Sequence, residues 1–143
     1  MKKKKIFWAG IILLSVLTAF YCDGDNGYNG NEPETPISDP SFSSHIQPIF
    51  TNNCALGGCH NSTAQEGLNL SQGVAYSNIV NVASTQVPAS MRVLPGDAAN
   101  SYLVKKIEGT QTVGVRMPKD RSALSSVSIQ NIKNWVNRGA KNN

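Results

Sequence analysis

The clearest hydrophobic pattern in the chain lies near its C-terminal end. Between Ser125 and Gly139 the apolar positions are separated by three, three and one residues, at Ile129, Ile132, Trp135 and Val136. This spacing places the apolar side chains on one face of an α-helix. A serine is a good N-cap and a glycine a common helix terminator. The sequence therefore predicts an amphipathic helix between Ser125 and Gly139.

Shorter apolar patterns predict three further helices, over residues 43–54, 72–80 and 97–109. The expected N-caps are Ser43 or Ser44 for the first of these helices and Asp97 for the third, which Gly109 ends. Their expected buried positions are, in chain order, Ile46, Ile49, Phe50, Tyr76, Ile79, Val80, Leu103 and Ile107. Pro48 is tolerable because it falls in the first turns of its helix.

The segments between these helices are long, and none shows the sustained alternation expected of a β-strand. They cover about residues 60–71, 81–95 and 109–124. We therefore expect an all-α domain with long loops. Because a bare helical bundle seldom carries such loops, we also expect a group other than side chains to fill part of the interior.

The N-terminal segment resembles a secretory signal. Lys2–Lys5 form a positive cluster, and Ile6–Phe20 form an apolar stretch that is shorter than the about 20 residues of a membrane-spanning helix. We expect residues 1–21 to be a signal peptide. Cys22 follows at once and is a candidate for lipidation, which favours a lipoprotein signal. Tyr21 is bulkier than the residue usually found before a lipidated cysteine, so ordinary cleavage or an uncleaved anchor stays open.

Charge changes the picture once this signal is set aside, since nine basic and nine acidic residues remain. The net positive charge of the whole chain belongs largely to the signal, and we expect no nucleic-acid partner. Residues 22–40 are rich in Gly, Asn, Asp and Pro and predict a disordered tether. The expected folded domain is residues 41–143. The lipid anchor would attach the protein to a membrane.

The candidate chemistry lies in the heptapeptide that runs from Cys54 to His60. Two thioethers from Cys54 and Cys59 and an imidazole from His60 would attach one c-type haem. Four residues separate the cysteines instead of the usual two, and the glycines among them, Gly57 and Gly58, can adopt the turn this requires. A Cys54–Cys59 disulfide and a zinc site completed by His45 are the alternatives, although His45 is more simply a solvent-facing residue at a helix start.

A haem with one histidine ligand has a second axial position, for which a methionine sulfur suits an electron carrier. Met117 stands in an expected loop, and Pro118 after it restricts the backbone that presents it. Met91 is the other candidate, and a sixth position that is open or filled by another group is the third possibility. Arg92 and Arg116 are expected either to pair with the haem propionates or to lie at the surface.

The order of several short motifs resembles the small monohaem c-type cytochrome domains labelled planctomycete-type. The resemblance covers about residues 45–140, through the strings Ile46–Phe50, Cys54, Cys59–His60, Gly67–Leu70, Val93–Asp97, Ser101–Leu103, Arg116–Pro118, Leu124–Ser125 and Trp135–Ala140.

This resemblance implies a cytochrome c-like fold wrapped around one covalent haem, with Cys54 and Cys59 as attachment points. It implies His60 as proximal and Met117 as distal iron ligand, and helices bearing Phe50 and Trp135 that cross near a haem edge. The expected role is single-electron transfer to a redox protein partner, without enzymatic activity, in the periplasm or on the outer face of a bacterial membrane. A haem peroxidase or gas sensor and a haem-free, disulfide-stapled surface lipoprotein are the alternatives.

Overall fold

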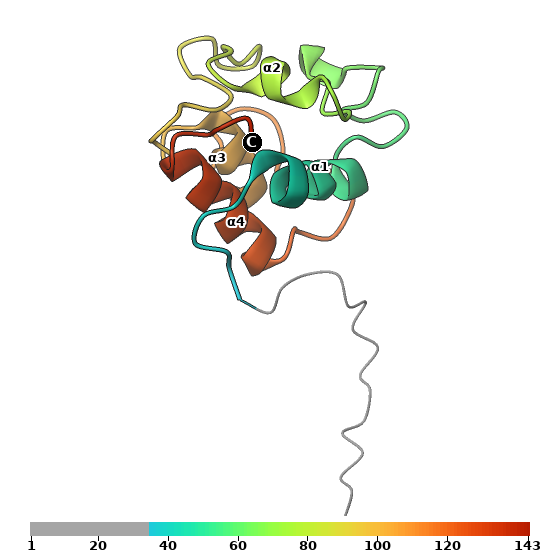
Figure 1. Cartoon of the computed structure of the whole chain (residues 1–143). Coiled ribbons are helices and arrows are strands. Elements are labelled where there is room, and N and C mark those ends of the chain that lie inside the picture. Colours follow the sequence, from blue (N-terminus) through green and yellow to red (C-terminus); the bar gives the residue numbers. More distant parts are fainter. Residues whose placement is uncertain (1–34) are drawn as a thin grey trace, which may run out of the picture.

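A computed structural model of the chain describes residues 35–143, which are helical, as expected (Figure 1). The elements in chain order are the π-helix η1 (Phe42–Ile46), α1 (Gln47–Asn53), the 3₁₀-helix η2 (Gln65–Gly67), α2 (Ala75–Ile79), α3 (Tyr102–Glu108) and α4 (Ser126–Asn137). Extended pairing within the described part is limited to two isolated bridges, Val80 with Val93 and Ala83 with Met91. None of the helices formed by residues 35–143 is long and apolar enough to cross a membrane.

The final helix begins and ends where its pattern predicts. Ser125 is the N-cap of α4, and its Oγ accepts a hydrogen bond from Ser128 N at 3.0 Å. Ile132, Trp135 and Val136 are buried along one face. Gly139 follows the helix with φ +94°, a conformation in which glycine has no steric penalty.

Two other expected caps are wrong, each by a few residues. Ser41, not Ser43 or Ser44, caps the first helical segment, because its Oγ accepts from Ser44 N at 3.3 Å. For α3 the N-cap is Ser101. Asp97 instead closes the turn that precedes α3, where its side chain accepts a hydrogen bond from Asn100 N at 3.0 Å. Short polar side chains accept hydrogen bonds from backbone N–H groups in turns as readily as at helix starts. The sequence pattern alone therefore did not distinguish a turn residue from a helix cap.

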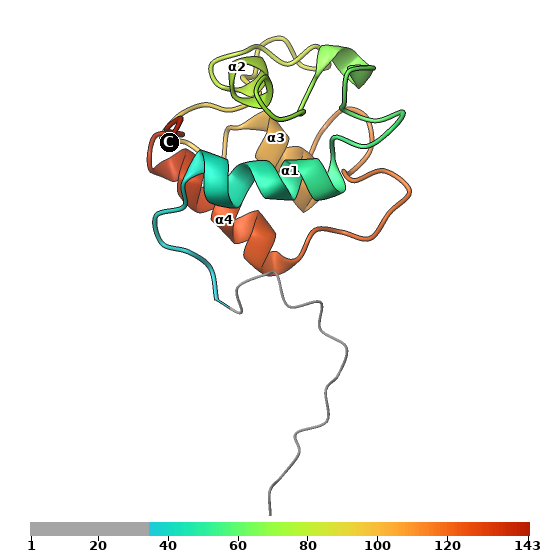
Figure 2. The ribbon, with the colours of Figure 1, turned by 45° about the vertical axis from the view of Figure 1, so that its right-hand side comes forward.

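The helices enclose a core of aromatic rings. Phe42 lies between Tyr76 and Trp135, with ring centroids 5.3 Å from each, and contacts Phe50 at 6.4 Å. These four residues form what we call the aromatic cluster. Figures 1 and 2 show α1 crossing α4, with α2 on the other side of α1 from α4. The cluster therefore joins the helices that bear Phe50 and Trp135.

Residues just before the expected boundary at 41 are fastened to the folded domain. Ile37 N donates to Asn131 Oδ1 at 2.7 Å, and Asn134 Nδ2 donates to Ile37 O at 2.7 Å. Both asparagines lie on α4, and Pro40 is buried. The last residues of the expected tether are thus fastened to the domain, while the rest of residues 22–40, like the expected signal, lies outside the described residues.

Candidate functional site

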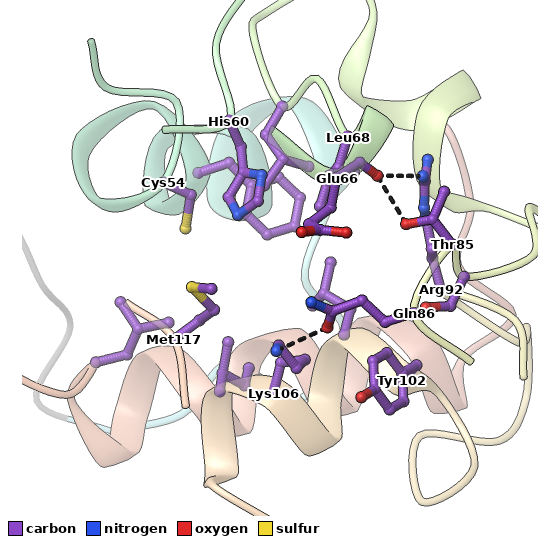
Figure 3. Close-up of a pocket in the computed structure, with 16 residues that line it drawn as sticks. Cys54, His60, Glu66, Leu68, Thr85, Gln86, Arg92, Tyr102, Lys106 and Met117 are labelled. Carbon is purple, nitrogen blue, oxygen red and sulfur yellow. Dashed lines mark hydrogen bonds between the residues drawn. The ribbon is translucent and has the colours of Figure 1, made fainter. Parts of the chain in front are cut away.

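A cavity lies between the loops and the helices α1 and α3. Its enclosed volume is about 80 Å³, and about 700 Å³ when the open solvent at its mouth is included. Its apolar wall is formed by Phe50, Leu68, Leu70, Leu103, Ile107 and Leu124. Cys54, His60 and Met117 also line it (Figure 3). An adjoining hollow shares these three residues and adds Cys59.

The segment from Cys54 to His60 is a closed turn that starts where α1 ends. Cys54 N donates to Phe50 O at 2.8 Å, and His60 N donates back to Cys54 O at 3.1 Å. Gly58 has φ +75°, whereas Gly57 is not in the left-handed region. The turn lets four residues separate the cysteines while both cysteines and His60 stay beside one continuous space.

Both cysteines are free thiols. Burial, followed by the nearby Cys59, raises the pKa of the Cys54 thiol to about 12, so at neutral pH Cys54 is a protonated and poorly nucleophilic thiol. The structure therefore does not join Cys54 to Cys59 in a disulfide. In residues 35–143 no three His, Cys, Asp or Glu side chains converge to hold a metal ion, so the zinc set that would include His45 is not assembled.

His45 serves the start of η1. Its Nδ1 accepts from Ser41 N at 3.0 Å, and the residue is half-buried rather than fully solvent-facing. The ring is therefore engaged in a local cap on the far end of the helical segment from Cys54.

The His60 ring is positioned by the backbone of the following loop. Its Nδ1 lies 3.1 Å from Gln65 O, and Leu70 N donates to His60 O at 2.7 Å. A carbonyl can only accept, so Nδ1 carries the proton in this contact and Nε2 holds the lone pair. Burial lowers the pKa of His60, and the positive charges of Lys106 and Arg92 lower it further. The neutral, oriented imidazole is the form that binds metal ions.

Met117 reaches the cavity from the opposite wall. Its backbone N donates to Lys106 O at 2.8 Å, which ties the loop 109–124 to α3. Figure 3 shows its thioether on the side facing Cys54 and His60. Met91, by contrast, is exposed at 37% and is not among the lining residues. The fold thus brings Met117, and not Met91, together with His60.

The two arginines lie in different places: Arg92 lines the cavity, whereas Arg116 lines an open hollow at the surface. Arg92 is buried, and its guanidinium donates to Asn78 O at 2.8 Å. It also donates to Glu66 O and Gly67 O, at 3.2 and 3.1 Å. Three of its five N–H groups therefore donate to backbone carbonyls, and Arg92 fastens the loop 60–71 to the rest of the domain. Arg116 does not line the cavity, and its aliphatic stem lies beside Gly109.

Among the polar residues of the cavity that sequence reasoning missed are Glu66, Gln86 and Lys106. Lys106 was placed on the predicted helix 97–109 without a role, although it lies three residues after Leu103, which is a core position. That spacing was the available signal, because a lysine on the apolar face of a helix is seldom buried without a purpose. Glu66 and Gln86 stand in loops, where no periodicity marks them.

The residues of this cavity fit a c-type haem. The donor set of a His/Met-ligated haem is two thiols, a neutral imidazole with its Nε2 unprotonated and a thioether on the facing side, and all of these lie beside the apolar wall. No protein-family model matches the chain, and no curated protein or solved structure matches it either. The assignment therefore depends on the side chains of the site.

Proposed function

We propose that this chain is an exported, monohaem c-type cytochrome of cytochrome c-like fold that carries single electrons. The observation that carries the proposal is the meeting of His60 and Met117 at one cavity. The two residues come from different loops, 57 positions apart in the chain, and both line the space beside Cys54. If His60 and Met117 served only to pack the core, there would be no reason for both side chains to line the same cavity.

The residues of the chain divide the work of holding the group. Cys54 and Cys59 would supply the thioethers, His60 the proximal and Met117 the distal ligand. Gln65 O keeps His60 oriented, and Lys106 O keeps the Met117 loop against α3. Bound there, the haem supplies a reversible ferrous–ferric couple, and a sulfur ligand favours the ferrous state. The protein contributes position and an apolar surrounding, and needs no catalytic acid or base.

A pyridine haemochrome spectrum tests this function directly. The chain should be produced with its signal in a host that carries the c-type haem maturation machinery, then purified from the exported fraction. One covalent haem per chain, retained after denaturation, is the expected result. Protein that folds without haem would overturn the proposal and favour a haem-free surface protein.

Carbon monoxide separates an electron carrier from an enzyme or sensor on the same fold. A His/Met-ligated iron has no open position, so the reduced wild-type protein should not change its spectrum under carbon monoxide. Rapid binding by the native protein would instead favour a peroxidase or gas-binding role. The measurement needs no variant and uses the purified holoprotein.

Export and a lipid anchor at Cys22 are part of the same proposal, supported by the sequence of residues 1–22. Metabolic labelling with palmitate should mark the wild-type chain and not Cys22→Ala. Equal labelling of both would overturn the lipid anchor while leaving the haem assignment intact.

A further inference from the structure

Lys106 is a buried cation in the wall of the cavity. Its side chain arises from α3 and only 8% of the residue is exposed. Nζ donates to Gln86 Oε1 at 2.9 Å and to Val113 O at 3.4 Å, and it lies 5.9 Å from the centre of the Tyr102 ring. Gly114 leaves room for it, since a Cβ there would lie 2.8 Å from Nζ. The surrounding segments are thus arranged to accommodate this ammonium group.

The charge of Lys106 has no anion paired with it in the part of the chain that the structure describes. The ion pairs among residues 35–143 are Lys119 with Asp120 and Lys133 with Glu108. Glu66 is the nearest acidic influence on Lys106, but its side chain forms no ion pair with Nζ and the residue is exposed. Burying a charge without a partner is costly. The arrangement is explained if an anion from outside the chain completes it.

The place of Lys106 relative to the cysteines indicates which part of a ligand it meets. Figure 3 shows the hydrogen-bonded pair Lys106 and Gln86 well separated from Cys54 across the cavity. On a haem, the vinyl groups that form thioethers and the two propionates occupy opposite edges of the ring. A haem fastened at Cys54 and Cys59 therefore directs its carboxylates away from the cysteines.

We propose that Lys106, assisted by Gln86, is the carboxylate-binding group of this cavity and pairs with a haem propionate. This inference rests on the proposed function. It adds Lys106 to the expected propionate contacts. Arg92 also lines the cavity, but three of its N–H groups donate to backbone carbonyls, and Arg116 lies outside the cavity. The compact ammonium of lysine suits a single carboxylate oxygen, and the amide of Gln86 adds N–H donors beside it.

The test uses the holoprotein and follows the haem carboxyl groups themselves. In the wild type, NMR of the propionate side chains across a pH series should show one carboxyl with a pKa well below the ordinary range, because a nearby cation favours the ionised form. Lys106→Met should raise that pKa. It should also lower the equilibrium constant for reduction by about tenfold, the order expected for losing one unit charge at a partly buried site.

Lys105→Met is the matched control. It removes the same charge from the neighbouring position of α3, but Lys105 does not line the cavity. The propionate pKa and the reduction potential of this variant should stay close to the wild-type values. Identical behaviour of the Lys105 and Lys106 variants would overturn the assignment.

Two further outcomes keep the inference separate from the proposed function. If Lys106→Met does not fold, the wild-type titration decides alone: two propionates that both titrate as ordinary carboxylic acids overturn the assignment. If the wild-type chain carries no covalent haem, the proposed function fails first, and the role of Lys106 fails with it. A holoprotein with normal axial ligands and unperturbed propionates overturns the Lys106 assignment only.

Discussion

The aromatic cluster and the cavity are built on opposite principles. In the cluster, side chains fill the space between helices: Trp135 and Phe50 are each 1% exposed, and the rings contact one another directly. Around the cavity, polar contacts to the backbone fasten the loops, as when Arg92 donates to three carbonyls and Tyr102 donates to Val113 O at 2.8 Å. The cluster is thus held by ring-to-ring packing, whereas the cavity wall is held by polar side chains that donate to the backbone of distant loops.

The largest effect is expected from removing both thiols at the cavity. Cys54→Ser combined with Cys59→Ser should abolish covalent haem attachment, and His60→Ala should prevent correct maturation, because the thioethers and the proximal imidazole act together. Haem staining after denaturing electrophoresis measures the attachment. The Cys22→Ala variant, which removes the one cysteine outside the haem motif, should keep its haem.

The double variant also sharpens the comparison of the two regions. The ring contacts of the aromatic cluster involve neither cysteine, so the helical circular dichroism of the haem-free protein should persist in part. Haem that resists denaturation in the absence of both cysteines would contradict the attachment model. Complete loss of helix would show that the two regions do not fold separately.

Breaking the aromatic cluster should cost the most stability of any single core change. Trp135→Ala removes a buried ring and the hydrogen bond from its Nε1 to Lys141 O at 2.9 Å. Substitutions of this kind cost about 3–5 kcal/mol in the free energy of unfolding. Arg138→Ala, at an exposed position just beyond α4, should change it by no more than about 0.5 kcal/mol. Urea unfolding measures both, and equal losses would contradict the central place of the cluster.

Met117 tests the cavity without disturbing the core. Met117→His should lower the reduction potential, because a second imidazole favours ferric iron more than a thioether does. Met117→Ala should open the iron to carbon monoxide and remove the weak long-wavelength sulfur-to-iron band of the ferric spectrum. Met91→Ala, at an exposed methionine, should do neither. Loss of the band in the Met91 variant and its retention in the Met117 variant would reverse the assignment.

The smallest effect is expected from the loop fastening at Arg92. Arg92→Met keeps the apolar stem but loses the hydrogen bonds to three carbonyls, and should lower the free energy of unfolding by about 1–3 kcal/mol. Arg116→Met should change it by no more than about 0.5 kcal/mol. Chemical denaturation of the two holoproteins gives the difference. Similar stabilities would show that the carbonyls are satisfied by water once the guanidinium is lost.

The predicted features that the structure confirms are those with a local cause. The periodicity from Ile129 to Val136 specified α4, and a serine and a glycine set its ends because capping involves only neighbouring residues. The buried positions Leu103 and Ile107 of α3 followed from the same spacing. Caps at Ser43 or Ser44 and at Asp97 were wrong because several short polar residues stood close together.

The sequence by itself determined the helical class, the main helix and the grouping of Cys54, Cys59 and His60, since each of these depends on spacing along a few turns of chain. Only the tertiary structure decided that Met117 lines one cavity with His60 while Met91 lies outside it, and that Arg92 donates to backbone carbonyls. It also decided that Lys106 lines this cavity without an ion pair among residues 35–143. The first two outcomes depend on where long loops cross. For Lys106, the spacing from Leu103 indicated the buried face of α3, but the groups around Nζ come from the loops that bear Gln86 and Val113. Loop paths follow from packing against distant segments, for which the local pattern of polar and apolar residues carries no signal.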